Sequence, residues 1–337
     1  MYNRMFRPGI SGFLLLLALA LCACRAESNK PTPIDPNYVL IEQLADQNGF
    51  KKIEMTDEQI VLQSPWTTLA LYKYSRKAAL NGTTIWLNAA TSVLEGKWAV
   101  TKADYEKTIL PILRPYDHLA DFGYKTIVLD PGHGGKDSGG VGPGTLLEKN
   151  IALRISKAIK ADLTKLGYDV HLTRKDDTFI ELEERCAIAK KLKADLFISI
   201  HCNAGSSKHA EGIESYSLSI PNFPSTNDTG KRKSSSESNP GNKHDKANVA
   251  LGHAVQKSII AKSGREDRGL RRARFVVLRD APCPATLVEC GFLSNATEAQ
   301  LLQNEKFVKK ISGAVATGID DYIGQVRKAR LIAADID

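Results

Sequence analysis

The sequence predicts an α/β fold with a mostly parallel sheet flanked by helices on both faces, preceded by a small α+β accessory domain. Two runs, 125–130 and 196–200, are nearly continuous in apolar residues, which is typical of strands buried on both faces of a parallel sheet. Between them, apolar residues recur every four positions over 151–163, and this spacing predicts a helix. Strands that alternate with helices of this length indicate an α/β sheet.

Residues 38–120 predict the accessory domain. Short apolar runs are interrupted there by Gly and Asn, which indicates strands joined by turns. No residues in this region form a catalytic arrangement, so a stalk is the default prediction. The predicted elements are strands at 52–55, 60–62 and 83–88 and helices near 38–47 and 102–110.

The main domain is predicted over 121–325. A polar loop, 206–248, interrupts it, because 226–246 is dense in Ser, Asn, Gly, Lys and Asp with almost no apolar residue. The tail, 326–337, is mixed in composition and is expected to extend or fray. The other predicted elements are strands at 125–130, 170–172, 196–200, 275–278 and 285–290 and helices at 151–163, 182–192, 247–260, 297–302 and 307–322.

The first 24 residues, 1–24, predict an export signal of the lipoprotein type. Basic residues precede the apolar run 13–21, which suits a signal-peptide core but is too short to span a bilayer. The run ends in Leu21-Cys22-Ala23-Cys24, which is similar to a lipobox with Cys24 as the lipid acceptor. An ordinary secretory signal is the alternative. Residues 25–37 hold three prolines and predict an extended tether.

The composition indicates a globular protein that does not bind nucleic acid. Of the 337 residues, 42% are hydrophobic and 25% are charged, which is the range of folded domains. The net charge of +8 is spread along the chain without interleaved aromatic residues, unlike a nucleic-acid-binding surface. The main domain has no Cys-x-x-Cys pair, which argues against a closed structural zinc site. Export would permit disulfides, but buried free thiols are expected for Cys186, Cys202, Cys283 and Cys290.

Three residues far apart in the chain, His133, Glu148 and His201, offer the ligands of an open metal site. Two imidazoles and one carboxylate suit Zn²⁺ and leave one coordination position for water or substrate. A fourth residue, Glu289, ends an apolar run and could act as a general base outside the ligand set. His209 is the fallback ligand, because it lies near His201 in the sequence.

Each of these residues taken alone has a structural explanation. Glu148 stands where a helix is expected to begin, and a carboxylate there stabilises the helix dipole. A lone histidine at a strand end, such as His201, is more often part of a hydrogen-bonded scaffold than a metal ligand. Glu289 could be a buried carboxylate paired with Arg279 or Arg268. Only the combination of the segments favours a metal site.

The segments together resemble the zinc-dependent N-acetylmuramoyl-L-alanine amidases, and the resemblance covers about 125–322. These enzymes cut the stem peptide from the lactyl group of peptidoglycan. The motifs that carry the resemblance are Asp130-Pro131-Gly132-His133-Gly134-Gly135, Leu147-Glu148-Lys149-Asn150, Ser199-Ile200-His201-Cys202-Asn203-Ala204, Glu211-Gly212-Ile213-Glu214 and Leu287-Val288-Glu289-Cys290-Gly291-Phe292.

The resemblance implies a fold like that of the zinc exopeptidases and the phosphorylase/hydrolase group. It implies that His133, Glu148 and His201 bind zinc and that Glu289 is the catalytic glutamate. The implied reaction is hydrolysis, by zinc-activated water, of the amide between the lactyl group of N-acetylmuramic acid and L-alanine. The alternatives are a catalytically silent peptidoglycan-binding protein and a zinc peptidase of related fold. Supporting or packing roles are expected for Arg174, Arg185 and Asn203.

The family resemblance and the N-terminal sequence also predict partners and a location. Peptidoglycan is the expected partner, in cell-wall remodelling or daughter-cell separation, and an activator protein could act on the polar loop 206–248. Lipid on Cys24 would hold the protein at a membrane. Because Arg25 is not acidic, nothing argues for retention at the inner membrane, and a periplasmic protein anchored to the outer membrane is expected. Wall binding, dimerisation and spacing remain open for 38–120.

Overall fold

The computed structural model describes residues 35–205, 207–228 and 235–335. Residues Pro36–Asp337 form one compact unit. The predicted signal, 1–24, and most of the predicted tether, 25–37, lie outside the described residues. Within the described ranges, no helix is long and apolar enough to cross a membrane.

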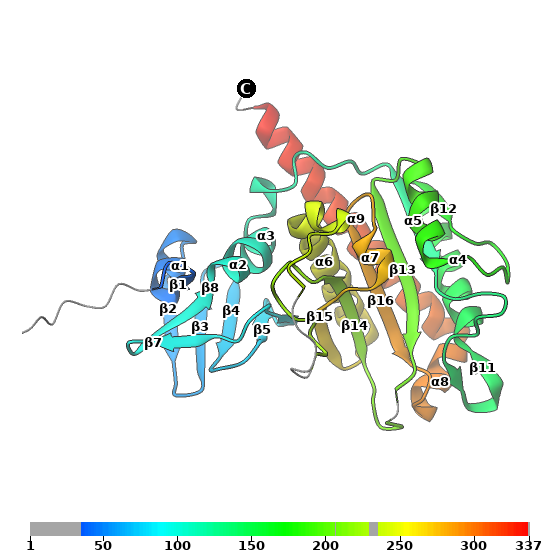
Figure 1. Ribbon diagram of the computed structural model, residues 1–337, viewed down its shortest axis with the longest axis horizontal. Helices are drawn as coiled ribbons and strands as arrows, with labels where there is room; N and C mark the ends of the chain where they lie inside the picture. The colour runs from blue at the N-terminus through cyan, green and yellow to red at the C-terminus, as the bar shows by residue number, and fades with distance from the viewer. Residues whose placement is uncertain (1–34, 206, 229–234, 336–337) are drawn as a thin grey trace, which may run out of the picture. The chain divides into compact units, whose positions relative to one another are not determined.

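The largest sheet of the described residues has eleven strands in the order β12-β9-β13-β16-β14-β15-β6-β5-β4-β3-β2 (Figure 1). The half that belongs to the predicted main domain is parallel except where β14 pairs antiparallel with β16. Its strands are β9 (Thr126–Pro131), β12 (Asp169–Leu172), β13 (Leu196–Asn203), β14 (Ile213–Leu218), β15 (Asp267–Ala273) and β16 (Ala285–Phe292).

Helices cover both faces of this half, as the alternation of apolar runs predicted. One face packs its Ile and Val side chains against α4 (Glu148–Lys165), α6 (Asp245–Ser263) and α9 (Glu305–Ala334). The other face packs against α5 (Leu182–Lys191) and the short α7 (Val276–Arg279). Because successive strand residues point to opposite faces, nearly continuous apolar runs bury side chains in both layers.

Part of 38–120 continues the same sheet through β2–β6, whereas β1, β8 and β7 form a separate three-stranded sheet. Strand β6 lies parallel to β15, with Ile85 opposite Leu270, and β5, β4, β3 and β2 follow as an antiparallel meander. The elements are β1 (Tyr38–Leu40), α1 (Ile41–Gln47), β2 (Lys52–Met55), β3 (Gln59–Gln63), β4 (Thr68–Tyr72), β5 (Lys77–Leu80), β6 (Thr83–Trp86), β7 (Ser92–Leu94), β8 (Lys97–Thr101), α2 (Lys102–Asp104), a π-helical turn at Tyr105–Ile109 and α3 (Leu110–Leu113).

The core of this region is shared with the rest of the unit. Its buried cluster includes Val249 of α6 and Leu270 of β15. A separate domain over 38–120 therefore stays a prediction.

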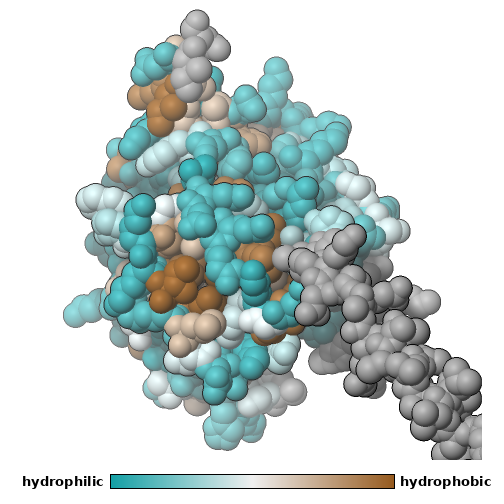
Figure 2. Space-filling model, turned by 90° about the vertical axis from the view of Figure 1, so that its left-hand side faces the viewer, coloured by the Kyte–Doolittle hydropathy of each residue, from teal (hydrophilic) through white to brown (hydrophobic). Residues whose placement is uncertain are grey.

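Figure 2, which views the left-hand side of Figure 1, shows a mostly hydrophilic surface with scattered hydrophobic patches. Within 38–120, the large apolar side chains that are exposed are Ile53, Met55, Trp66 and Tyr74.

The prediction of a mostly parallel sheet was wrong, and the observed sheet is mixed. The antiparallel meander β2–β6 is one reason, because its short hairpin connections allow only antiparallel pairs. The second reason is β14, which lies inside the predicted polar loop 206–248. All six residues of β14 are buried, although Glu214 and two serines make the segment polar in sequence.

One strand was not predicted, and two further expectations fail. Residues 267–273 form β15, and 275–278 are not a strand, because 276–279 form the helical turn α7. The tail prediction is wrong as far as Ala334, because α9 continues to that residue with Val326 and Ala329 buried. The remaining short elements are β10 (Val141–Gly142), β11 (Leu146–Leu147), α8 (Ala296–Gln303) and 3₁₀ turns at Pro115–Asp117, Pro143–Thr145 and Pro240–His244.

Candidate metal centre

The candidate site lies where three parallel strands end. His133 stands two residues after the end of β9, His201 lies near the end of β13, and Glu289 lies near the end of β16. In the β13–β16 ladder His201 is the register partner of Glu289. Ligand sites of α/β sheets form at the carboxyl ends of the strands, and the order β9-β13-β16 brings these three positions to one edge.

The turn after β9 holds His133 in an unusual backbone conformation. Its φ is +60°, a left-handed conformation that His adopts more readily than most residues. Two buried arginines hold the turn. Arg174 Nη2 donates to the carbonyl oxygen of Gly132 at 2.6 Å, and Arg185 Nη2 donates to that of His133 at 2.9 Å. Arg185 also binds Asp130 at 2.8 Å. Both arginines thus support the ligand-bearing turn.

Two glycines allow the ligands to converge. A Cβ added at Gly132 would lie 2.3 Å from Cε1 of His201. A Cβ added at Gly139, whose φ is +65°, would lie 2.5 Å from Cδ2 of His133 and 2.6 Å from Oε2 of Glu148. Either added atom would overlap a side chain of the cluster, so the site depends on the absence of side chains at both positions.

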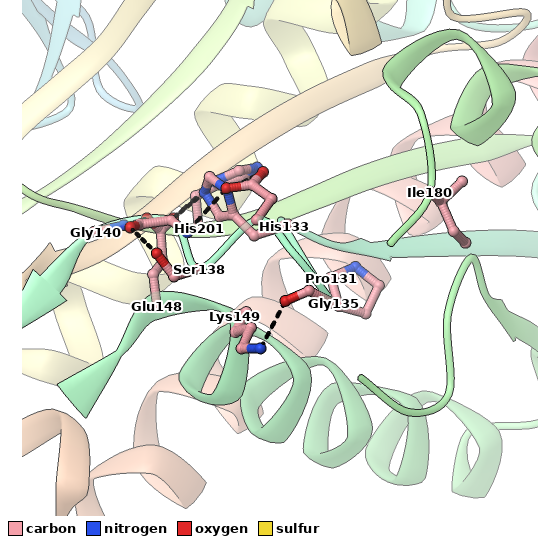
Figure 3. Close-up of polar contacts among 12 residues, drawn as sticks. Pro131, His133, Gly135, Ser138, Gly140, Glu148, Lys149, Ile180 and His201 are labelled. Carbon is pink, nitrogen blue, oxygen red and sulfur yellow. Dashed lines mark hydrogen bonds and ion pairs between the residues drawn. The ribbon is translucent and has the colours of Figure 1, made fainter. Parts of the chain in front are cut away.

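His133, Glu148 and His201 come together as the sequence predicted. Their possible ligand atoms all lie within 4.8 Å of one another, and they are the only such group of His, Cys, Asp or Glu among the described residues. His133 Nε2 lies 3.0 Å and His201 Nδ1 2.8 Å from Oε1 of Glu148. Figure 3 shows both imidazoles converging on Glu148, which begins α4. The fallback ligand His209 is exposed and outside this group.

The cluster has a supporting set of hydrogen bonds. Nδ1 of His133 lies 2.8 Å from Oδ2 of Asp137, an arrangement that fixes the ring and directs the other nitrogen toward a metal. The backbone N–H groups of Gly140 and Cys202 donate to Glu148 at 2.8 Å and 3.1 Å. Lys149 donates to the carbonyl oxygen of Gly135 at 2.9 Å (Figure 3), which ties the helix start to the His133 turn. The sequence analysis missed Asp137, although its position four residues after His133 was a usable signal.

Burial and charge shift the pKa values of these groups in opposite directions. Burial would raise the pKa of Glu148, but hydrogen bonds from His133 and His201 outweigh it and hold that pKa far below its usual value. Burial would lower the pKa of His133, but Glu148 and Asp137 outweigh it and raise that pKa. The cluster therefore keeps an anionic carboxylate between two imidazoles.

Glu289 differs from Glu148 because it has no cationic partner. Its side chain is buried, and Oε2 has no hydrogen-bond partner among the described residues. Burial, followed by the charges of Glu148 and Glu214, raises its pKa well above the usual value. The structural alternative does not hold for either proposed arginine, because Arg279 pairs with Asp280 and Arg268 pairs with Glu214.

Glu214 is a structural carboxylate that the sequence analysis named within a family motif but gave no role. It lies opposite Glu289 in the β14–β16 ladder and binds Arg268 at 2.8 Å and Arg271 at 2.7 Å. Asn203 Nδ2 also donates to it at 2.8 Å, so Asn203 supports this carboxylate. Two neighbouring buried glutamates thus have different environments, one neutralised by arginines and one without a partner.

A cavity of about 650 Å³ opens over these residues, within the usual range for ligand sites. The three candidate ligands and Glu289 all line it. Its other walls include Leu182, Arg274 and Phe275. One cavity therefore joins a metal-binding cluster, an unpaired carboxylate and room for a substrate.

The donor set fits Zn²⁺. Two imidazole nitrogens and one carboxylate are the protein ligands of several catalytic zinc sites, which leave a position open. The orphaned Oε2 of Glu289 in the same cavity is what a base acting on a metal-bound ligand requires. The four cysteines among the described residues are free and buried, and Cys202 and Cys290 pack into the core on the α4, α6 and α9 face. None of these thiols competes for the site.

Comparisons with known proteins agree with this geometry. The family described as N-acetylmuramoyl-L-alanine amidase matches residues 127–321. AmiA of Escherichia coli strain K12 is 34% identical over 221 residues, which cover 59% of this chain and 76% of AmiA. AmiC of Neisseria meningitidis serogroup B is 34% identical over 219 residues, 58% of this chain but only 52% of AmiC. This chain thus spans about half the length of AmiC.

A solved structure shows the same relationship. The catalytic domain of the amidase CwlV from Bacillus (Paenibacillus) polymyxa var. colistinus is 34% identical, with a TM-score of 0.50. The match covers 59% of this chain and 98% of that domain. The chain therefore belongs to the N-acetylmuramoyl-L-alanine amidase family of peptidoglycan hydrolases.

Proposed function

We propose that this protein uses Zn²⁺, held by His133, Glu148 and His201, to hydrolyse the amide between the lactyl group of N-acetylmuramic acid and L-alanine. Glu289 is the general base. The observation that carries the proposal is the unpaired Oε2 of Glu289, buried in the cavity that also exposes the three ligand residues.

Zinc, when bound, would supply a Lewis acid that polarises the amide carbonyl and acidifies water. Glu289 accepts the proton of the attacking water and returns it to the departing amine of L-alanine. Its burial beside two other carboxylates raises its pKa, which makes the carboxylate a stronger base. Asp137 orients His133, and the hydrogen bonds from Arg174 and Arg185 fix the turn on which that ligand stands.

The two alternatives predict different products. A silent binding protein would leave the stem peptides attached, and a zinc peptidase would cut within them. Every position that the chemistry needs holds a competent residue, which favours hydrolysis. The shared motifs around Glu148 and Glu289 favour the amidase over the peptidase.

The test is mass spectrometry of purified peptidoglycan after incubation with the protein, with a zinc-chelated sample and a zinc-restored sample alongside. Released stem peptides with a new amino-terminal alanine, lost on chelation and regained with zinc, support the proposal. Fragments cut inside the stem would favour the peptidase. Intact stems with zinc bound would favour a binding protein or an enzyme that needs an activator.

Export, lipidation of Cys24 and an outer-membrane location are also proposals, supported by the sequence of 1–25. They would place the active site in the periplasm, where cell-wall remodelling and daughter-cell separation occur. Labelling cells with a fatty-acid probe tests this step. A labelled protein that loses its label in Cys24→Ser supports lipidation, whereas label retained by that variant or absent from the native protein contradicts it.

An activator acting on the polar loop 206–248 remains a proposal for the part outside β14 and α6. Segment 219–228 bonds to both halves of the sheet. Arg274 donates to the carbonyl oxygen of Phe223 at 2.7 Å, and Arg76 of the 38–120 region donates to that of Ser225 at 3.1 Å. A partner that moved this segment would move one wall of the cavity. Replacing 227–238 by a Gly-Ser linker should abolish any stimulation of turnover by cell-envelope extract, and stimulation that persists would rule the proposal out.

A further inference from the structure

Two arginines line the cavity, Arg185 and Arg274. Arg185 is buried, and Asp130 neutralises it at 2.8 Å. Arg274 forms no ion pair with any carboxylate in the described part of the chain. Its Nη2 donates to the neutral carbonyl oxygens of Ile220 and Phe223 at 3.0 Å and 2.7 Å. Arg274 is thus the cavity arginine whose charge has no partner.

One donor of Arg274 has no hydrogen-bond partner. Its Nε is buried and has no hydrogen-bond partner. Asp228 is close enough to attract the guanidinium, but its Oδ2 accepts from the backbone N–H of Ser225 at 3.1 Å and makes no ion pair with Arg274. A half-buried guanidinium with an unsatisfied N–H favours an anionic acceptor, because charge-assisted hydrogen bonds are the strong ones.

Arg274 belongs to a different wall from the candidate metal ligands. Those ligands follow β9, begin α4 and end β13, whereas Arg274 joins β15 to α7. Phe275 and Val276 continue the same wall, and the Phe275 ring packs edge-on against Tyr216 at 5.1 Å. The wall therefore offers one free positive charge next to apolar surface, away from the groups that act on the scissile bond.

We propose that Arg274 forms a carboxylate-binding subsite of this cavity and selects stem peptides whose carboxylates are free. This inference rests on the proposed function, because it takes the ligand to be the stem peptide. Stem carboxylates can be free or present as carboxamides. Because Nη2 already donates to two carbonyl oxygens, a carboxylate would bind through the charge of the guanidinium and a donor other than Nη2. A carboxamide carries no charge, so its hydrogen bond would be weaker.

The test compares two muramyl peptides of identical sequence, one with free stem carboxylates and one with carboxamides. The native protein should cleave the free form with a kcat/KM about 10- to 100-fold higher, the usual range for a hydrogen bond to a charged group. Arg274→Gln should bring this ratio close to one, chiefly by raising KM for the free form. Arg274→Lys, which keeps the charge but loses the guanidinium donors, should fall between the two.

Arg279→Gln is the matched control, because it removes the same charge from a residue that pairs with Asp280 and does not line the cavity. It should leave the ratio unchanged. If Arg274 only holds the 220–223 segment in place, its substitution will slow both peptides equally and preserve the ratio. A preserved ratio, or no preference in the native protein, would overturn the proposal.

Binding of the two peptides, measured by calorimetry, separates this inference from the proposed function. If neither peptide is cleaved, cleavage does not support the proposed function, yet tighter binding of the free form that is lost in Arg274→Gln would still support the subsite. Equal affinity of the native protein for both peptides would reject it.

Discussion

His201 and Glu289 are register partners at the ends of the parallel strands β13 and β16. Residues directly opposite each other in a ladder point to the same face of the sheet, so backbone pairing places a candidate ligand beside the proposed base. The position of Glu289 depends on the sheet and not on the metal. Ligand residues and base should therefore be separable by substitution.

Asp137→Asn should weaken zinc binding by about 10- to 100-fold, the usual effect of removing the partner of a ligating histidine. The asparagine would no longer offer Nδ1 of His133 a charged acceptor at 2.8 Å. Competition with a chromophoric chelator measures the affinity. Glu184→Gln, on the exposed surface of α5, is the control, and equal affinities in the two variants would show that Asp137 does not act through His133.

Zinc affinity should fall as the pH is lowered from about 8 to 6, because zinc must displace a proton from His133. The pKa of His133 is raised in the metal-free protein. The protonated form is therefore favoured below the ordinary histidine pKa, about 6.5, and is lost as the pH rises through the raised value. Calorimetry in buffers of different ionisation enthalpy should detect proton release. Binding without pH dependence would contradict the role of His133.

Glu214→Gln should destabilise the protein by about 3 kcal/mol, because it leaves Arg268 and Arg271 without their common buried anion. Glu211→Gln is the control, since Glu211 pairs with Arg265 at 2.6 Å but is 46% exposed. Loss of that exposed pair should cost less than about 1 kcal/mol. Urea unfolding of both variants measures the difference, and similar costs would mean that the Glu214 network is not structural.

His253→Gln should remove a source of acid sensitivity. Burial lowers the pKa of His253 on α6 to about 4, against about 6.5 in an unfolded chain. Above about pH 6.5 His253 is neutral in both states and does not affect the free energy of unfolding. As the pH falls toward 4, the unfolded chain gains a proton that the folded protein cannot, and the free energy of unfolding decreases by up to about 3 kcal/mol. Urea unfolding at pH 7 and pH 5 should show a smaller difference for this variant than for the native protein. His209→Gln, at an exposed histidine, should behave like the native protein, and equal pH dependence in all three would contradict the assignment.

The sequence predicted the helices and strands whose buried side chains are mainly apolar. Strands β9, β13 and β16 are nearly continuous apolar runs, and α4 carries a regular apolar stripe. These elements carry His133, Glu148, His201 and Glu289, so the candidate site followed from them. The family motifs then supplied the roles that spacing alone could not.

The strands that the sequence analysis missed, β14 and β15, bury charged residues that form ion pairs with each other. Strand β14 contains Glu214 and lies in a segment predicted as loop, and β15, which contains Arg268 and Arg271, was not predicted, because charged residues rarely form a buried strand alone. The glutamate and the arginines neutralise each other across the sheet, so both strands can be buried. No local sequence pattern indicates a contact between residues more than 50 positions apart. The run 275–278 misled in the opposite way, since a short apolar segment suits a strand or a helical turn equally.

The most direct test is Glu289→Gln, in which zinc content and turnover are measured on the same sample. The amide keeps the shape of the carboxylate but cannot accept the proton. Zinc content should stay equal to that of the native protein, while release of stem peptides with amino-terminal alanine should fall by about 10²- to 10⁴-fold. Native turnover in this variant, or loss of zinc together with activity, would contradict the role of Glu289 as a base outside the ligand set.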